Sequence, residues 1–186
     1  MSDDILPAAL AQGLRQEAQR RWESGLFRTA TVGPTLAKRQ DTDIRGDSIC
    51  WLQAHDVQAD ITAFHDWAVR TQSLLNREFF IGLRWLECHF ARYGSGAGYT
   101  RHVDQHVASS ARKISLVLYL NPEWQPGDGG ELCIYHPESP DTEQVRIAPR
   151  MGRLMLFRSD LIPHAVLPCS SARWSLTGWF RSDEPT

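Results

Sequence analysis

The chain has 186 residues, 42% of them hydrophobic and 23% charged, which is typical of one soluble globular domain. Its formal net charge of −2 argues against a broad basic surface for nucleic acid. The first residues are acidic and no stretch approaches the roughly 20 apolar residues that span a bilayer, so we predict neither a secretory signal nor a membrane partner.

The N-terminal residues predict a helix, followed by short strands and a loop. Leu6, Leu10 and Leu14 recur every four residues, which predicts an amphipathic helix over 3–25 that ends at Gly25. We then expect a strand, a polar loop and a second strand, at residues 26–33, 34–47 and 48–52. The loop is long for a compact domain, and loops of this length are often functional or mobile.

The remaining sequence predicts a second helix and then a β core. Ile61 and Phe64 begin an apolar stripe at helical period, which predicts a helix over 59–78 with Asp60 as its N-cap. From residue 84, short apolar runs alternate with turn residues, as in a β-sandwich or barrel. We therefore expect a single mainly β domain over 1–186. Its helical and strand N-terminal part is 1–83, its core is 84–181, and both helices pack on one face.

Two distant motifs carry the residues of a metal site. His102 and Asp104 are two residues apart, so on a strand they would share one face. His164 begins a later apolar run, and Arg173 follows nine positions further on. Two histidines and a carboxylate form the facial triad of non-haem Fe(II) oxygenases. The planar fork of an arginine can hold a carboxylate by two parallel hydrogen bonds. His106 competes for the ligand role, but we expect it beyond the strand end.

Several other residues are assigned no catalytic or metal-binding role. The histidines without a partner at ligand spacing are His55, His65, His89 and His136. The tryptophans assigned to the core or an interface are Trp22, Trp51, Trp67 and Trp85. The four cysteines form no CxxC pair, which favours reduced, buried thiols in a cytoplasmic protein.

Five motifs extend the metal pattern over most of residues 26–181. They are DIRGDSICW (43–51), YGSGAGYTRHVD (93–104), RKISLVLYLNPEW (112–124), GGELCIY (129–135) and PHAVLPCSSARWSLTGWF (163–180). Together they resemble the Fe(II)- and 2-oxoglutarate-dependent dioxygenases, and within these the prolyl hydroxylases of the hypoxia-sensing type and their bacterial relatives.

The resemblance implies a double-stranded β-helix (jelly roll) with N-terminal helices packed on one face. It implies an enzyme that hydroxylates a prolyl residue of a protein substrate, with a translation factor as the substrate suggested by analogy. Fe(II), 2-oxoglutarate and O2 would be required, with ascorbate in a supporting role.

The resemblance also implies roles for individual residues. The iron ligands would be His102, Asp104 and His164, which with Arg173 form the catalytic set. The 2-oxoglutarate pocket would be formed by Arg173, Tyr119, Tyr93 and Thr177. The substrate peptide would be contacted by Tyr99, Arg112, Trp179, Arg45 and Asp47, the last two in a loop that closes over it.

Two other functions fit the residues. One keeps the oxygenase chemistry but acts on a small molecule such as a free amino acid. The other is a non-catalytic jelly-roll module with a structural metal, because imidazole and carboxylate also bind Zn(II). The tripeptide Arg45–Gly46–Asp47 has an adhesion interpretation and a plainer one, a salt-bridged turn. The sequence does not determine the oligomeric state.

Overall fold

The structure, a computed structural model, describes residues 1–31, 40–53, 55–105 and 110–184. The predicted loop over 34–47 therefore lies partly outside the described residues, and His106 lies wholly outside them. These residues form two helices, α1 (Ala8–Glu23) and α2 (Ala59–Phe79), and ten strands in two sheets. Within the described residues, no helix is long and apolar enough to cross a membrane.

The larger sheet has six strands in the order β1-β2-β3-β10-β5-β8. They are β1 (Arg28–Thr29), β2 (Asp47–Trp51), β3 (Trp85–Tyr93), β10 (Arg173–Arg181), β5 (Arg112–Tyr119) and β8 (Leu154–Arg158). The smaller sheet has the order β4-β9-β6-β7. Its strands are β4 (Tyr99–His102), β9 (His164–Val166), β6 (Leu132–His136) and β7 (Ser139–Ile147). Neighbouring strands pair antiparallel in both sheets.

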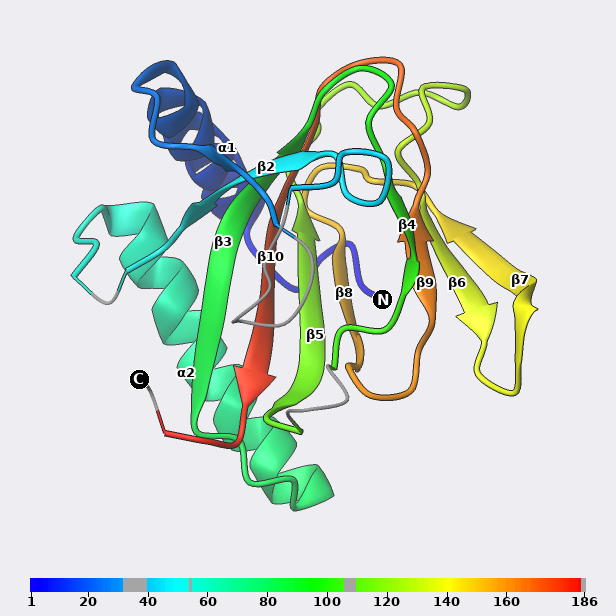
Figure 1. The fold of residues 1–186 in the computed structure, drawn as a ribbon. Helices are drawn as coiled ribbons and strands as arrows, with labels where there is room; N and C mark the ends of the chain where they lie inside the picture. The colour runs from blue at the N-terminus through cyan, green and yellow to red at the C-terminus, as the bar shows by residue number, and fades with distance from the viewer. Residues whose placement is uncertain (32–39, 54, 106–109, 185–186) are drawn as a thin grey trace.

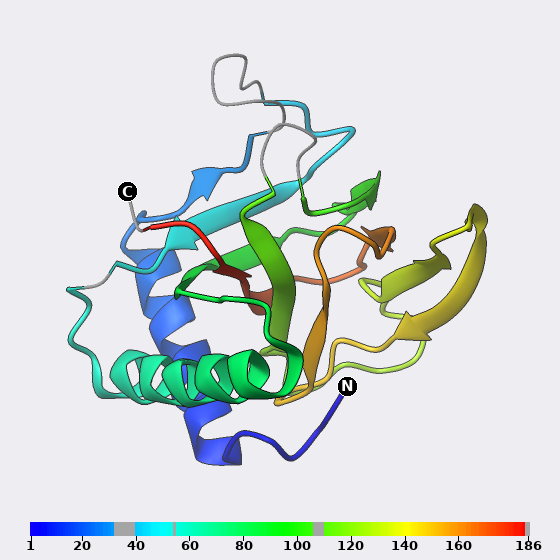
Figure 2. The same cartoon turned by 90° about the horizontal axis from the view of Figure 1, so that it is seen from below.

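Both helices cover one face of the larger sheet, and the smaller sheet packs on its other face (Figures 1 and 2). This confirms the expected mainly β jelly roll with helices on one side. Alternation along β10 explains the two layers, because successive side chains of a strand point to opposite faces. Leu176 and Phe180 join the core beneath the helices, whereas Thr177 and Trp179 line a pocket on the opposite face.

The predicted helix over 3–25 was too long at both ends. Pro7 precedes α1 in an extended conformation, and Ser24 caps its C-terminus before Gly25 at φ 69°. Asp60 was wrong as an N-cap, because Gln58 occupies that position and Asp60 lies in the first turn of α2. Of the predicted strand over 26–33, residues 32 and 33 lie outside the described residues, and within 26–31 the strand is limited to Arg28–Thr29. All four cysteines are free and buried, as expected.

Candidate active site

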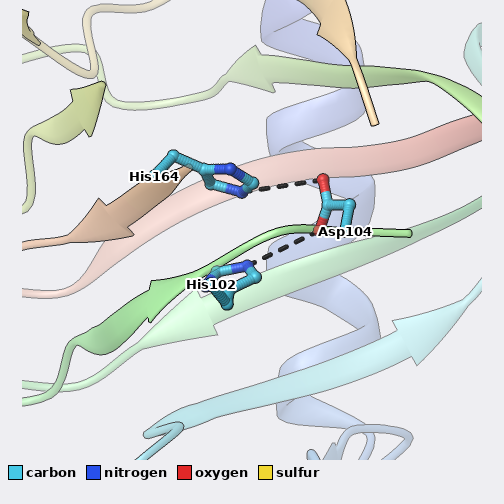
Figure 3. Close-up of side chains that lie close together, drawn as sticks. All are labelled: His102, Asp104 and His164. Carbon is cyan, nitrogen blue, oxygen red and sulfur yellow. Dashed lines mark ion pairs between the residues drawn. The ribbon is translucent and has the colours of Figure 1, made fainter. Parts of the chain in front are cut away.

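His102, Asp104 and His164 converge between the two sheets (Figure 3). One ligand atom from each residue lies within 4.8 Å of the others. His102 Nε2 is 3.5 Å from Asp104 Oδ1, and His164 Nε2 is 3.6 Å from Asp104 Oδ2. The two histidines are paired across β4 and β9, which brings together residues 62 positions apart in the sequence. One part of the expectation was wrong: β4 ends at His102, so the bend after the strand presents Asp104.

Backbone carbonyls orient both imidazoles toward this common point. His102 Nδ1 lies 2.9 Å from the Thr100 carbonyl oxygen, and His164 Nδ1 lies 3.0 Å from the Ile162 carbonyl oxygen. A carbonyl can only accept, so each Nδ1 carries the proton and each Nε2 keeps a free lone pair. This is the arrangement in which histidine binds a metal ion, with its second nitrogen fixed by an outer partner.

Asp104 is held in its ionised form by its surroundings. The Ser115 hydroxyl donates a 2.6 Å hydrogen bond to Asp104 Oδ2, and Ser159 lies 2.9 Å from that hydroxyl. Burial alone would raise the pKa of Asp104, but the adjacent His164 and His102 outweigh burial and lower it. Burial lowers the pKa of His164, against the opposing charge of Asp104. A carboxylate beside two imidazoles is a donor set suited to a divalent transition metal.

The cluster opens into a pocket of about 400 Å³ between the sheets. Every residue that the sequence assigned to iron, co-substrate or substrate lines this pocket, except Tyr119. Arg173 lies at one end, with only 4% of its surface exposed. Its Nε donates to the Gly130 carbonyl at 2.9 Å and its Nη1 to Ser175 Oγ at 3.3 Å. No carboxylate among the described residues pairs with it, and a buried, unpaired guanidinium is costly.

Two tyrosines enclose the guanidinium. The centre of the Arg173 guanidinium is 5.1 Å from the ring of Tyr93 and 5.1 Å from that of Tyr119. Tyr119 is fully buried beside Arg173, and its hydroxyl has no hydrogen-bond partner among the described residues. Burial raises the pKa of Tyr119 to about 12, although the charge of Arg173 opposes the shift. An unpaired cation beside an unpaired hydroxyl is a site for an anionic group.

Gly130 makes room for this arginine. Its backbone has φ +72°, and an added Cβ would lie 3.2 Å from Arg173 Cδ and 3.2 Å from Cys169 Cβ. Thr177 lines the pocket two residues beyond Ser175, and the two hydroxyl oxygens lie 3.2 Å apart.

At the other end of the pocket, Trp179 and Arg112 form a stacked pair. The Arg112 guanidinium lies 3.5 Å from the centre of the Trp179 ring, and its Nε donates to Glu87 at 2.8 Å. Glu87 also accepts from Arg181 at 2.7 Å. Both the indole and the guanidinium line the pocket, so a cationic and aromatic surface borders the His102–Asp104–His164 cluster on this side.

Tyr99, Arg45 and Asp47 form a third part of the pocket wall. The Tyr99 ring stacks on the imidazole ring of His102 at a centroid distance of 3.6 Å. Arg45 lies over Tyr99 and donates to Asp47 at 2.6 and 2.9 Å, which confirms the salt-bridged turn. In this arrangement, Asp47 neutralises Arg45 and Tyr99 supports the position of His102.

Sequence reasoning missed His89, Trp51 and Ser115, all of which belong to the site. His89 and Trp51 line the pocket, and Ser115 holds Asp104. The signal for His89 was present, because it lies four residues before Tyr93 on the same strand and therefore shares its face. Ser115 was not visible as a partner of Asp104, because only the folded β5 brings the two together.

Comparison with known proteins shows which family the sequence matches. Residues 88–181 match the 2OG-Fe(II) oxygenase superfamily. A prolyl-4-hydroxylase from Pseudomonas putida has a similar structure, with a TM-score of 0.86 and 36% identity over 97% of this chain and 90% of that one. A Trichoplax adhaerens prolyl hydroxylase, solved with a hypoxia inducible factor oxygen degradation domain peptide, gives a TM-score of 0.84 and 27% identity over 98% and 82%.

A curated relative adds a second kind of similarity. Egl nine homolog 1 of Rattus norvegicus is 29% identical over 98% of this chain. The chain spans about half the length of this relative, with 55% of it aligned.

Proposed function

The chain belongs to the 2OG-Fe(II) oxygenase superfamily, and on that premise we propose that it is a prolyl hydroxylase acting on a protein substrate. One observation carries the proposal: a His-Asp-His cluster shares a pocket with a buried arginine that has no carboxylate partner among the described residues. A structural metal site would need the three metal-binding side chains but not the buried arginine. An oxygenase that takes a dicarboxylate co-substrate has a use for both.

The chemistry of the donors fits Fe(II) and 2-oxoglutarate. His102, Asp104 and His164 would hold the iron through two lone pairs at Nε2 and one carboxylate. Arg173, with the Tyr119 hydroxyl beside it, would bind the carboxylate of 2-oxoglutarate that is far from the iron. Tyr93 and Thr177 would line the 2-oxoglutarate pocket. When bound, iron, 2-oxoglutarate and O2 supply the oxidising power that converts a C–H bond to C–OH, with release of succinate and CO2.

The chain itself contributes binding, orientation and exclusion of water. The hydrogen bond from Ser115 and the stacked ring of Tyr99 restrict the ligands Asp104 and His102. The Trp179 indole and the Arg112 guanidinium would contact the substrate beside the metal, where an aromatic face suits a proline ring. Arg45 and Asp47 would close the side of the pocket next to Tyr99.

The protein substrate is favoured over a small molecule by the relatives. The Trichoplax enzyme carries a peptide of a protein, and the Pseudomonas putida enzyme is a prolyl-4-hydroxylase. We further propose a cytoplasmic location, because four buried free cysteines suit a reducing compartment. A translation factor stays the substrate class predicted by analogy.

A stepwise titration tests the proposal. The metal-free protein is titrated anaerobically with Fe(II) and then with 2-oxoglutarate, while the weak visible charge-transfer band of the chelate is followed. We expect the band to appear, and we expect peptides with a central proline to gain one oxygen atom by mass spectrometry. A protein that holds metal but gives no band would support the structural-metal module instead.

Shortening the 34–47 segment separates the two oxygenase functions. A peptide hydroxylase should lose peptide turnover while it still consumes 2-oxoglutarate slowly without substrate. An enzyme for a free amino acid should hydroxylate that amino acid and leave all prolyl peptides unchanged.

A further inference from the structure

His89 is a buried polar group without a partner in the described structure. Only 1% of its surface is exposed, and neither ring nitrogen has a hydrogen-bond partner among the described residues. Burial, followed by the charge of Arg45, lowers its pKa to about 3, so the ring is neutral near pH 7. A neutral imidazole carries one N–H donor and one acceptor, and buried groups of this kind are normally hydrogen-bonded.

The position of His89 excludes the two roles already assigned in the pocket. The metal-ligand group consists of His102, Asp104 and His164, and His89 is not part of it. The anion end is formed around Arg173, which is paired with Tyr93 across β10 and β3, whereas His89 is paired with Thr177. Four residues of β3 separate Tyr93 from His89, which places them about 13 Å apart along the strand.

His89 instead belongs to the part of the pocket that contains Trp179. Its ring centroid is 5.6 Å from that of Trp179 and 4.7 Å from that of Trp51, and all three residues line the pocket. The Trp179 Nε1–H is also buried and without a partner among the described residues. An indole nitrogen is only a donor. Two neighbouring side chains therefore leave donors unsatisfied on one wall beside the metal cluster.

A polypeptide at proline offers the complementary groups. Proline has a main-chain carbonyl but no N–H, so the segment around it presents acceptors without a matching donor at that residue. The wall offers such a segment two unpaired donors, beside the one acceptor nitrogen of the imidazole.

We propose that His89 positions the substrate by donating a hydrogen bond to a main-chain carbonyl at or next to the target proline, with the Trp179 indole as a neighbouring donor. The inference rests on the proposed prolyl hydroxylase function and names a residue that selects for peptide. The competing interpretation is that His89 only fills space between Trp51 and Trp179. In that case its nitrogen atoms would be dispensable and its volume alone would matter.

The test compares His89→Leu with His89→Gln in the iron-loaded enzyme, using synthetic nine-residue peptides with one central proline. We expect His89→Leu to raise the peptide KM about three- to tenfold, the loss expected for one hydrogen bond. The KM for 2-oxoglutarate and the visible band should stay unchanged, and His89→Gln, which keeps a donor, should restore most of the peptide affinity. His65→Leu is the matched control, because His65 Nε2 is also buried and unpartnered but lies outside the pocket.

A change in the peptide tests the same hydrogen bond from the substrate side. A thioamide at the proline carbonyl, or at the preceding one, weakens the acceptor without changing the backbone shape. At one of these positions it should raise the KM of the wild type and of His89→Gln, both of which keep a donor, and leave that of His89→Leu less affected. Equal effects on all proteins, or an unchanged peptide KM in His89→Leu, would overturn the assignment of His89.

The failure of the broader proposal has a different signature. A wild-type enzyme that binds 2-oxoglutarate but hydroxylates none of the peptides would overturn the prolyl function and the role of His89 with it. If the wild type is active and the His89 variants have the same peptide KM as the wild type, only the role of His89 is overturned.

Discussion

Replacement of Arg173 by methionine should weaken 2-oxoglutarate binding far more than it harms the fold. The guanidinium is almost fully buried and has no carboxylate partner among the described residues, so the carboxylate it would bind is its main compensation. Truncating one member of a buried, hydrogen-bonded charge pair costs about 2–5 kcal/mol. At 1.4 kcal/mol for each factor of ten, the dissociation constant should rise roughly 30- to 4000-fold. The anaerobic titration with Fe(II) and 2-oxoglutarate measures this change directly.

Thermal unfolding of the same variant provides the second half of the test. Removing an unpaired buried charge should leave the metal-free protein as stable as the wild type or slightly more stable, despite the lost hydrogen bond to Gly130. 2-Oxoglutarate should raise the Tm of the iron-loaded wild type but not that of Arg173→Met. Arg112→Met is the matched control, because it removes a second pocket arginine beside Trp179. An unchanged 2-oxoglutarate requirement in Arg173→Met would refute the assignment of the anion end.

Three further changes test the parts of the site separately. Ser115→Ala removes the donor to Asp104 and should weaken metal binding about 10- to 100-fold in a Co(II) titration, whereas Ser115→Thr should not. Asp47→Ala leaves the Arg45 guanidinium buried without its partner and should cost about 3–5 kcal/mol of unfolding free energy in urea, much of it recovered when Arg45 is also replaced. The pKa of His89 is lower in the folded protein than in the unfolded chain, so the unfolded chain takes up a proton first as the pH falls. The free energy of unfolding should therefore decrease by up to about 1.4 kcal/mol per pH unit from pH 6.5 toward pH 3. Urea melts of His89→Gln should lack this part of the pH dependence.

Features that depend on local sequence were predicted well. Helical spacing located α2 to within one residue at its C-terminal end, and the short apolar runs after residue 84 gave the β core. The spacing of His102 and Asp104, with His164 and Arg173, predicted residues that the fold brings together in one pocket, and their roles toward iron and 2-oxoglutarate stay predictions. These features follow from side-chain periodicity and ligand chemistry, both of which are properties of the chain itself.

Features that depend on contacts between distant strands were predicted poorly. The end of β4 at His102 is set by pairing with β9, so no local pattern revealed that a bend presents Asp104. Ser115 is eleven residues from Asp104 and meets it only because the fold brings β5, a strand of the larger sheet, beside the bend after β4. His89 was dismissed as a single histidine because its neighbours Trp51 and Thr177 lie on other strands.

The distribution of unsatisfied polar groups connects the fold to the proposed reaction. Alternation along β3 and β10 places Tyr93 and Arg173 at one end of the pocket and His89 and Trp179 at the other, with the metal cluster facing both. The first end presents a cation without a carboxylate among the described residues, and the second presents ring nitrogens without acceptors there. Each set is costly in the isolated protein, and each would be satisfied by a different ligand. Under the proposed function, the larger sheet would therefore place a small anion and a polypeptide on either side of one metal ion.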